Sequence, residues 1–205
     1  MNLEVVKQYF YPITILDIGA NTGGWYTEAA RCFPGSNIFS IEANPECEEK
    51  LKGTNPEYLI CLLAKDNEMY DFYTTKNAKG ATGDSMYKEL TYNYADENLV
   101  VIKRQGHKLD GLFEKGSAFD LIKMDVQGAE LDIIKGGLNI FRASKGAILE
   151  VALKEFNQNA PLYDEVVEYM NSINFRLAET LEDLYHLGEI YHKDLFFVNE
   201  NIIRN

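Results

Sequence analysis

The amino-acid sequence predicts an α/β protein with a doubly wound, mostly parallel, Rossmann-like sheet. An apolar run at 13–18 ends in a glycine-rich turn and continues as a helical pattern. The same order recurs, because further short apolar runs alternate with helical segments along the chain. Four acids, Asp17, Glu42, Asp66 and Asp125, stand where predicted strands end. Ligands of doubly wound sheets bind at the carboxyl ends of the strands, so we expect these acids to share one crevice.

The first half of the chain alternates strands and helices with short connections. Pro12 stops the first helix and Pro34-Gly35 ends the second, because proline and glycine interrupt regular structure. Pro45 suits the first position of a third helix. The elements expected here are a short helix at 2–10, a strand at 13–18, a helix at 25–33, a strand at 37–42, a helix at 45–51, one buried strand at 58–63 and an edge or hairpin strand at 69–75.

The second half opens with residues 76–98, which have no clean period. We interpret them as an irregular active-site loop, because structureless loops of this length are usually functional or disordered. The sheet then resumes and ends in a C-terminal antiparallel strand. The elements expected here are strands at 99–103, 119–126 and 147–153, a helical turn at 109–113, helices at 127–134 and 161–170, and last strands at 175–178, 183–187 and 194–198.

Composition indicates a single ordinary globular domain. The 205 residues contain no repeat, low-complexity tract or linker, so we expect one domain over 1–205. The net charge of −12 argues against a nucleic-acid partner. The densest basic cluster is small, and we interpret it as a solvated strand end: Lys103, Arg104, His107 and Lys108.

The cysteines and the N-terminal segment indicate a reduced protein. Cys32, Cys47 and Cys61 are odd in number and lack C-x-x-C spacing, which favours neither a disulfide framework nor a zinc site. The N-terminus lacks the basic region and apolar core of a signal peptide, and no apolar run is long enough to cross a membrane. We therefore expect a cytoplasmic protein without a membrane span.

The glycine turn after the first strand brings backbone N–H groups and a helix N-terminus to one point. Gly19, Gly23 and Gly24 are expected there because a ligand approaches where a Cβ would sit, and because the turn can require positive φ. The spacing is D-x-G-x-x-x-G, whereas the dinucleotide fingerprint requires a glycine at Asn21. The pattern favours the opening loop of S-adenosylmethionine-dependent methyltransferases over a glycine turn in some other α/β protein.

Two further strand-end acids are candidates for contacts with an adenosyl group. Glu42 lies about twenty residues past the glycine turn, where a carboxylate can accept hydrogen bonds from both ribose hydroxyls. Its alternative role is that of an acid at the N-terminus of the next helix. Asp66 is a candidate acceptor for the adenine amino group, or a turn-forming residue before Asn67.

Three blocks of sequence, taken together, are more specific than any one motif. They are LDIGANTGGW at 16–25, FSIEANPECEEKL at 39–51 and DLIKMDVQGAELDIIKGG at 120–137, followed by ILEV at 148–151. The order of these blocks and their residues resemble the FkbM family of S-adenosylmethionine-dependent methyltransferases over about residues 13–178. The chain departs from the family pattern at Asn174, where glycine is common, which alters only a turn.

The resemblance implies a class I methyltransferase fold and O-methylation of a hydroxyl on a small molecule, a lipid or a glycan. The cofactor is then S-adenosylmethionine, and its methyl group is transferred by direct in-line attack. Asp17 receives the cofactor ammonium, Glu42 the ribose and Asp66 the adenine. The residues implied to bind the cofactor are Asp17, Gly19, Ala20, Asn21, Gly23, Glu42, Ala43, Asp66 and Asp125.

The exit of the strand at 119–126 carries the candidate catalytic residues. An alcohol is a poor nucleophile at neutral pH, so a base or an electrostatic stabiliser is needed near the methyl group. Asp125 is the first candidate for general base or substrate anchor, beside Lys123, and its alternative role is to cap the following helix. Gln127 and Glu130 are candidate substrate-binding residues, although Glu130 suits a capping box equally well.

Glu150 lies inside an otherwise apolar strand, where a carboxylate is costly to bury without a partner. It therefore either pairs with Lys123 or faces the substrate cavity as a catalytic residue. Asp125 and Glu150 alone are a weak metal signal, so no metal site is predicted. The alternative bases are three histidines for which a structural role is favoured: His107, His186 and His192.

The enzyme interpretation has two rivals. One is a domain that binds S-adenosylmethionine or a partner without turnover, and the other is a dehydrogenase, which the glycine spacing disfavours. The sequence does not name the acceptor or the oligomeric state. Tyrosines of the irregular loop suit stacking on a sugar or an aromatic ring, or packing of the loop itself: Tyr87, Tyr92 and Tyr94.

Overall fold

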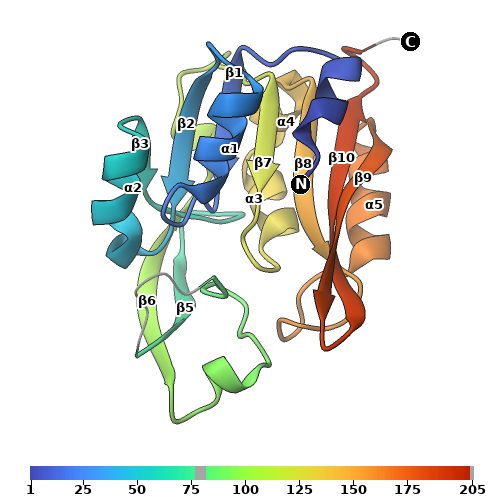
Figure 1. Ribbon diagram of the computed structural model, residues 1–205. Coiled ribbons are helices and arrows are strands. Elements are labelled where there is room, and N and C mark those ends of the chain that lie inside the picture. The colour runs from blue at the N-terminus through green and yellow to red at the C-terminus, as the bar shows by residue number, and fades with distance from the viewer. Residues whose placement is uncertain (77–81, 204–205) are drawn as a thin grey trace.

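The computed structural model describes residues 1–76 and 82–203 and contains the doubly wound sheet that the sequence predicts (Figure 1). Seven strands are ordered β3-β2-β1-β7-β8-β10-β9. The first five are parallel, whereas β10 is antiparallel to both β8 and β9. The strands are β1 (Thr14–Ile18), β2 (Asn37–Glu42), β3 (Tyr58–Ile60), β7 (Leu121–Met124), β8 (Gly146–Ala152), β9 (Phe175–His186) and β10 (Glu189–Asn199).

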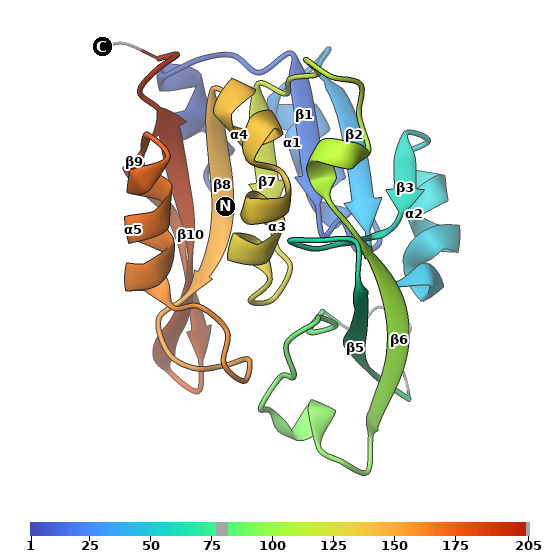
Figure 2. The ribbon, with the colours of Figure 1, turned by 180° about the vertical axis from the view of Figure 1, so that it is seen from behind.

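Helices cover both faces of the sheet, as Figures 1 and 2 show from opposite sides. On one face, η1 (Leu3–Gln8) and α1 (Gly24–Cys32) bury apolar side chains against the sheet. On the other, α3 (Glu130–Gly136), α4 (Leu138–Ala143) and α5 (Tyr163–Ser172) do the same. The central strands are apolar on both sides because both faces are covered. The remaining helical segments are η2 (Pro45–Cys47), α2 (Glu48–Thr54), η3 (Tyr92–Tyr94) and η4 (Leu109–Gly111).

The apolar run at 58–63 forms two strands in two sheets, and the prediction of a single buried strand was wrong. β3 pairs with β2, and β4 (Leu62–Leu63) pairs with β6 (Leu99–His107) of a second, three-stranded sheet. The chain changes partner at Cys61, whose N–H still donates to the Glu42 carbonyl at 2.8 Å. Hydropathy alone does not reveal such a change, because both halves of the run are apolar.

The second sheet carries the predicted hairpin strand. β5 (Met69–Thr75) pairs antiparallel with β6 along its whole length. β6 is longer than the predicted 99–103 and includes Lys103, Arg104 and His107 of the small basic cluster, whereas Lys108 follows the strand. Its cations face local partners: Lys103 is 2.7 Å from Asp71, and Arg104 donates to the Ala43 carbonyl at 2.5 Å. The interpretation of this cluster as a strand end agrees with those contacts.

β9 and β10 form one long hairpin where three short strands were predicted. Register shifts interrupt the pairing at three points, so the period-two alternation that indicates a strand is broken in the sequence. The preceding turn contains Asn174 at φ +68, a left-handed conformation that asparagine tolerates almost as readily as the glycine common in the family. The departure at Asn174 thus leaves the turn intact.

The irregular segment after β5 was predicted as an active-site loop. Of the predicted 76–98, residues 77–81 lie outside the described residues, and 82–98 contain η3 and an isolated bridge between Ser85 and Tyr73. This segment and the tip of the β9–β10 hairpin lie at the same end of the molecule, beyond the carboxyl ends of the parallel strands (Figures 1 and 2).

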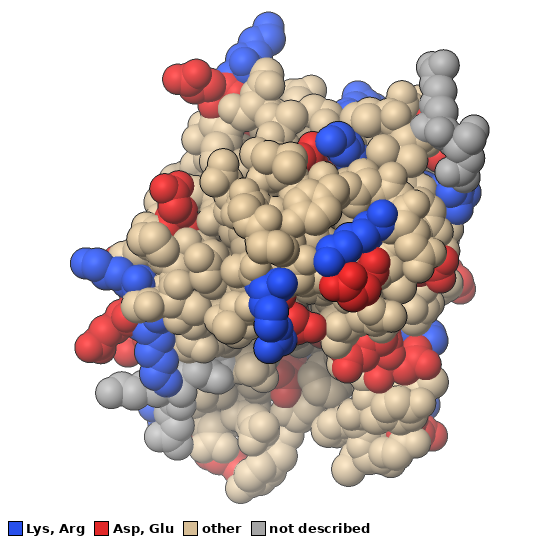
Figure 3. Space-filling model, turned by 45° about the horizontal axis from the view of Figure 1, so that its top comes forward, with Lys and Arg blue, Asp and Glu red and all other residues tan. Residues whose placement is uncertain are grey.

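The surface mixes both signs of charge. On the face shown in Figure 3, Lys and Arg side chains are interspersed with Asp and Glu rather than gathered in one basic field. Over the described ranges, no helix combines the length and the hydropathy that crossing a bilayer requires. The same ranges hold no group of three or more His, Cys, Asp and Glu side chains arranged to bind a metal ion.

Candidate active site

The glycine turn after β1 is shaped by protein contacts. Gly19 has φ +78, and a Cβ at this position would lie 1.8 Å from the Asp125 carbonyl oxygen. Gly23 has φ +87, and its Cβ would lie 2.7 Å from the Thr54 side chain. The expectation that a ligand occupies the Cβ position was therefore wrong for Gly19 and Gly23, whereas the expected positive φ is confirmed at both. Gly24 has open space at its Cβ position. Glycine is needed at 19 because the exit of β7 passes directly against the turn.

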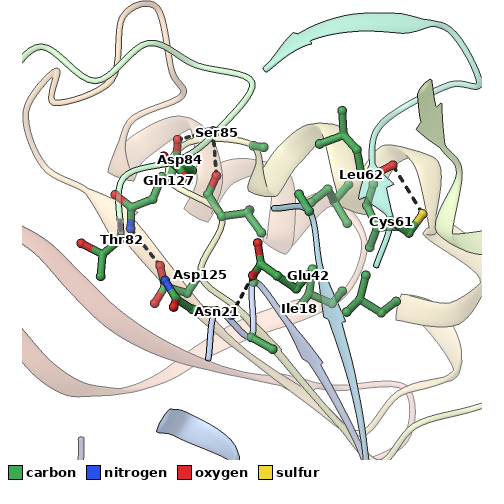
Figure 4. A pocket seen from close by; sticks show the side chains of 18 of the residues that line it. Ile18, Asn21, Glu42, Cys61, Leu62, Thr82, Asp84, Ser85, Asp125 and Gln127 are labelled. Atoms are coloured by element: carbon green, nitrogen blue, oxygen red, sulfur yellow. Dashed lines mark hydrogen bonds between the residues drawn. The ribbon is translucent and has the colours of Figure 1, made fainter. Parts of the chain in front are cut away.

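Glu42 lies at the end of β2 and faces the turn (Figure 4). Its Oε2 accepts from the Asn21 backbone N–H and its Oε1 from the Asn44 N–H, both at 2.7 Å. Burial raises the pKa of this carboxyl, and the two backbone donors act in the opposite direction. Because each carboxylate oxygen has a further lone pair, Glu42 is held in place and can still accept from a ligand.

A cavity of about 470 Å³ opens beside Glu42 at the carboxyl ends of the strands. One wall is the backbone of the turn at 19–22, and the opposite wall is apolar. The Trp25 indole N–H is buried there and has no partner among the described residues. The lining residues are Ile18, Gly19, Ala20, Asn21, Thr22, Gly24, Trp25, Ile41, Glu42, Ala43, Lys50, Cys61, Leu62, Leu63, Phe72, Thr82, Asp84, Ser85, Met86, Lys123, Asp125, Val126, Gln127, Ala129 and Ile133.

Three of the predicted cofactor-binding residues do not line this cavity. Gly23 packs against Thr54, and Asp17 is fully buried beneath the cavity. Asp66 accepts from the Tyr70 hydroxyl at 2.6 Å and the Glu68 N–H at 3.2 Å, so it has the turn-forming role that was its alternative. The other predicted cofactor-binding residues all line the cavity.

Lys123 is buried between two carboxylates. Its Nζ is 3.6 Å from Asp17 and 3.5 Å from Asp125, and it lies 5.8 Å above the Trp25 ring. Burial opposes protonation of this amine, but Asp125 and Asp17 outweigh burial and raise its pKa. Lys123 therefore stays cationic and fixes the position of Asp125. Burial raises the pKa of Asp17, and Lys123 acts in the opposite direction.

Gln127 joins the two candidate catalytic carboxylates. Its amide nitrogen donates to Asp125 at 2.8 Å and to Glu150 at 2.9 Å. Burial raises the pKa of Glu150 well above its usual range, and the charges of Asp125 and Asp194 act in the same direction. The sequence left Glu150 either paired with Lys123 or facing the substrate. The structure gives it a hydrogen bond to Gln127 and a place in the lining of a second cavity.

Glu130 holds the loop that carries Gln127. Its Oε1 accepts from the Val126 N–H at 3.2 Å and the Gly128 N–H at 3.4 Å. Glu130 is the first residue of α3 and Ala129 is the N-cap, without a side-chain cap, so the capping box that the sequence left open is not formed. Burial raises the pKa of Glu130 to about 7. It lines neither cavity, so the structure does not bring this predicted substrate-binding residue to the site. Its contacts maintain a strained turn, with Gln127 at φ +54.

Sequence reasoning missed Asp84 and Ser85. The Ser85 hydroxyl lies 2.9 Å from the carbonyl oxygens of both Val126 and Gln127 (Figure 4). Asp84 accepts from the Asn44 side chain at 2.6 Å and the Tyr94 hydroxyl at 2.8 Å. Their segment has no periodic pattern, and these partners are 10 to 42 residues away in sequence. The local bond, from the Tyr87 N–H to the Ser85 hydroxyl at 3.2 Å, is one that any serine turn can form, so it does not mark a site.

A second cavity of about 800 Å³ adjoins the first and shares Thr82, Asp125 and Gln127 with it. It lies between the segment 82–98 and the tip of the β9–β10 hairpin. His186 and His192, two of the alternative bases, line it; His107 does not. The lining residues are Thr75, Lys76, Thr82, Gly83, Glu89, Thr91, Asn93, Tyr94, Asn98, Asp125, Gln127, Glu150, Phe156, Leu184, Tyr185, His186, Tyr191 and His192.

Phe156 is the centre of an aromatic cluster in the second cavity. Its ring centroid lies 5.4 Å from His186, 5.6 Å from Tyr191 and 4.9 Å from His192, each in an edge-to-face arrangement. Burial lowers the pKa of His192, against the effect of Asp125, so this imidazole is neutral at pH 7. The cavity thus combines ring faces with carboxylates and neutral hydrogen-bonding groups.

Comparison with protein families matches residues 17–177 to the methyltransferase FkbM domain. The chain belongs to the FkbM methyltransferase family. Apart from Leu16, the match covers the three sequence blocks that meet at the first cavity, and it confirms the resemblance. S-adenosylmethionine is accordingly the cofactor of this domain, and the cavity beside Glu42 is called the cofactor cavity from here on.

Individual relatives of this FkbM-family chain are distant. The hexuronic acid methyltransferase AglP of Haloferax volcanii is 27% identical over 141 residues, which cover 66% of this chain and 54% of AglP. Among solved structures, methyltransferase FkbM from Methylobacillus flagellatus KT superposes with a TM-score of 0.53 at 15% identity, covering 90% of this chain and 43% of that one. The chain thus spans about half the length of these relatives.

A SAM-bound structure shares the same fold. Magnesium protoporphyrin IX methyltransferase (ChlM) from Synechocystis PCC 6803 superposes with a TM-score of 0.54 at 10% identity, covering 96% of this chain and 74% of that one. This chain has the features that an adenosyl cofactor requires. The cofactor cavity offers apolar side chains for a planar base and the Glu42 carboxylate for hydroxyls.

Proposed function

We propose that this FkbM-family domain catalyses S-adenosylmethionine-dependent methylation of a hydroxyl group on a sugar. The observation that carries the proposal is the junction of the two cavities, where Asp125 and Gln127 line both. A group transferred from one ligand to another must pass through such a junction. The second cavity is therefore called the acceptor cavity.

The chemistry of the acceptor cavity supports a sugar. Aromatic faces of Phe156 and Tyr191 suit the C–H faces of a pyranose ring, and carboxylates of Glu89 and Glu150 suit its hydroxyl groups. The relative from Haloferax volcanii is named a hexuronic acid methyltransferase, which supports the same substrate class.

We assign cofactor binding to the residues that line the cofactor cavity. Glu42 accepts from the ribose hydroxyls, the backbone of 19–22 faces the methionine part, and the apolar side chains of Leu62, Leu63 and Ile133 pack on the adenine. When bound, the cofactor supplies an electrophilic methyl group on a sulfonium centre. The buried carboxylates around the junction favour a cationic ligand there.

Glu150 is assigned as the proton acceptor and Asp125 as the anchor of the acceptor hydroxyl. The raised pKa of Glu150 brings it closer to neutral pH, where a general base is most effective. Lys123 holds Asp125 by an ion pair, and the Gln127 amide fixes the spacing of the two carboxylates. As the acceptor oxygen attacks the methyl carbon, the methyl–sulfur bond would break to leave S-adenosylhomocysteine, and the hydroxyl proton would pass to Glu150, so that the oxygen develops little net charge.

The test begins with the cofactor. Calorimetric titration with S-adenosylhomocysteine is expected to give micromolar binding, with none for NADH, and Glu42→Ala should weaken it about tenfold by removing charge-assisted hydrogen bonds. A screen of sugars with labelled S-adenosylmethionine then tests turnover. Failure of folded protein to bind S-adenosylhomocysteine would overturn the proposal. Binding without methyl transfer to any acceptor would favour the alternative of a non-catalytic domain.

A further inference from the structure

Exposed apolar side chains stand in the sequence at or directly beside residues that line the acceptor cavity. Leu90 and Tyr92 lie on the segment 82–98 with exposed fractions of 52% and 78%, and Tyr185 and Leu187 lie at the hairpin tip with 67% and 91%. We call these four residues the apolar rim. They are four of the ten large apolar side chains that are exposed among the described residues, so the cluster differs from the single exposed residues that any surface carries.

The loop at 153–162 connects the two sides of the apolar rim. The Leu90 N–H donates to the Phe156 carbonyl at 2.9 Å, and Glu89 and Asn157 form an isolated bridge. The Phe156 ring in turn packs on His186 at the hairpin tip. Tyr185 both lines the cavity and faces solvent, which marks the point where the cavity opens. Both sides lie at one end of the molecule (Figures 1 and 2).

Leu187 is an unfavourable residue for its position on two separate counts. It is the first residue of the two-residue turn Leu187–Gly188, with φ +50, where Asn, Asp or Gly is preferred because a left-handed backbone crowds a Cβ. It is also a leucine exposed almost completely to water. A residue that is poor for both the turn and the free surface indicates a role in binding.

We propose that the acceptor is an amphiphile, a sugar carried on an alkyl or polyprenyl chain, and this rests on the function proposed above. The sugar occupies the polar, aromatic interior, and the chain leaves through the mouth along the apolar rim. One ligand then accounts for both the carboxylates inside and the apolar side chains outside. The apolar rim covers the part of the alkyl chain nearest the sugar. Recognition of the alkyl chain is separate from recognition of the sugar.

The experiment compares two glucosides on protein saturated with S-adenosylhomocysteine. Octyl β-D-glucoside, kept below its micelle concentration, is expected to bind at least about tenfold more tightly than methyl β-D-glucoside, because the rim removes methylene groups from water. The double variant Leu187→Asn, Tyr92→Ser should lose most of this advantage. Asparagine suits the turn, so the variant keeps its fold. The matched control is Ile13→Ser, an exposed apolar residue that precedes β1 at the opposite end of the sheet.

The outcomes separate this inference from the proposed function. One outcome is that wild type and Ile13→Ser bind octyl glucoside more tightly than methyl glucoside, with a smaller difference in the double variant. That result supports the apolar rim as the binding site of the alkyl chain. Three outcomes overturn the amphiphilic acceptor: equal binding of both glucosides, no binding of octyl glucoside, or an unchanged preference for octyl glucoside in the double variant. In each case, binding of S-adenosylhomocysteine leaves the methyltransferase assignment standing. Failure to bind S-adenosylhomocysteine overturns both.

Discussion

The cofactor cavity and the acceptor cavity are formed by different kinds of structural element. The first uses strand ends and one tight turn, and its acid Glu42 is held by two backbone N–H groups. The second uses an irregular segment, a hairpin tip and the loop at 153–162, joined by few backbone contacts. On the proposed function, the sheet positions the cofactor and peripheral segments select the acceptor, as is general for folds that serve many reactions.

The largest expected effect is on turnover at the junction. Glu150→Gln should lower kcat by about 10²–10⁴-fold, because the amide cannot accept the acceptor proton. Affinity for S-adenosylhomocysteine should stay within about twofold, since Glu150 lines only the acceptor cavity. Single-turnover rates and calorimetry measure the two quantities. The exposed Glu155→Gln serves as a matched control, and near-normal kcat in Glu150→Gln would remove Glu150 from the reaction.

The rigidity of the cofactor half is tested by a pair of glycines. Gly19→Ala should lower the free energy of unfolding by at least about 3 kcal/mol, because its Cβ would overlap the Asp125 carbonyl in a left-handed turn. Gly24→Ala should be neutral or stabilising by up to about 1 kcal/mol, since its Cβ meets nothing within 4 Å and it begins α1. Urea unfolding measures both. Equal losses in the two variants would show that close approach at position 19 is unimportant.

The acceptor half should impose a pH dependence on stability. Burial and the charge of Asp125 raise the pKa of Asp194 to about 7, while Lys123 opposes them. The folded state therefore holds this proton more tightly than the unfolded chain, so its stabilisation is present at about pH 4 and is lost as the pH rises through about 7. Wild type should lose about 1–3 kcal/mol of its free energy of unfolding between pH 5 and pH 8 through this group, and Asp194→Asn should not show this loss. An unchanged pH profile of urea unfolding in the variant would contradict this.

The smallest effect concerns the hairpin tip. Leu187→Asn should raise the free energy of unfolding by about 0.5–1 kcal/mol, because asparagine adopts the left-handed turn more readily than leucine. Thermal unfolding measures the gain. A stability gain that accompanies weaker binding of octyl glucoside would identify leucine at this position as a residue kept for the ligand. A loss of stability would mean that Leu187 packs in a way its exposure does not indicate.

The sequence predicts the cofactor half better than the acceptor half for a physical reason. Glu42 can be identified because a strand, a turn and a helix set its distance from the glycines. Asp84 and Ser85 cannot, because their partners lie across the fold and their segment has no period. The run at 58–63 was taken as one strand because burial is visible in hydropathy but the choice of pairing partner is not. Asp66 shows the limit of the strand-end rule, since a turn there satisfies its carboxylate.

Ser85 and Asp84 belong to one short segment, yet they contact the loop of Gln127 and the region after Glu42. The same segment continues into the wall of the acceptor cavity at Glu89 and Thr91. A ligand that orders this segment from either side reduces the ordering that the other ligand must impose. We therefore predict that binding at the two cavities is thermodynamically linked. The factor by which the cofactor tightens the acceptor equals the factor by which the acceptor tightens the cofactor.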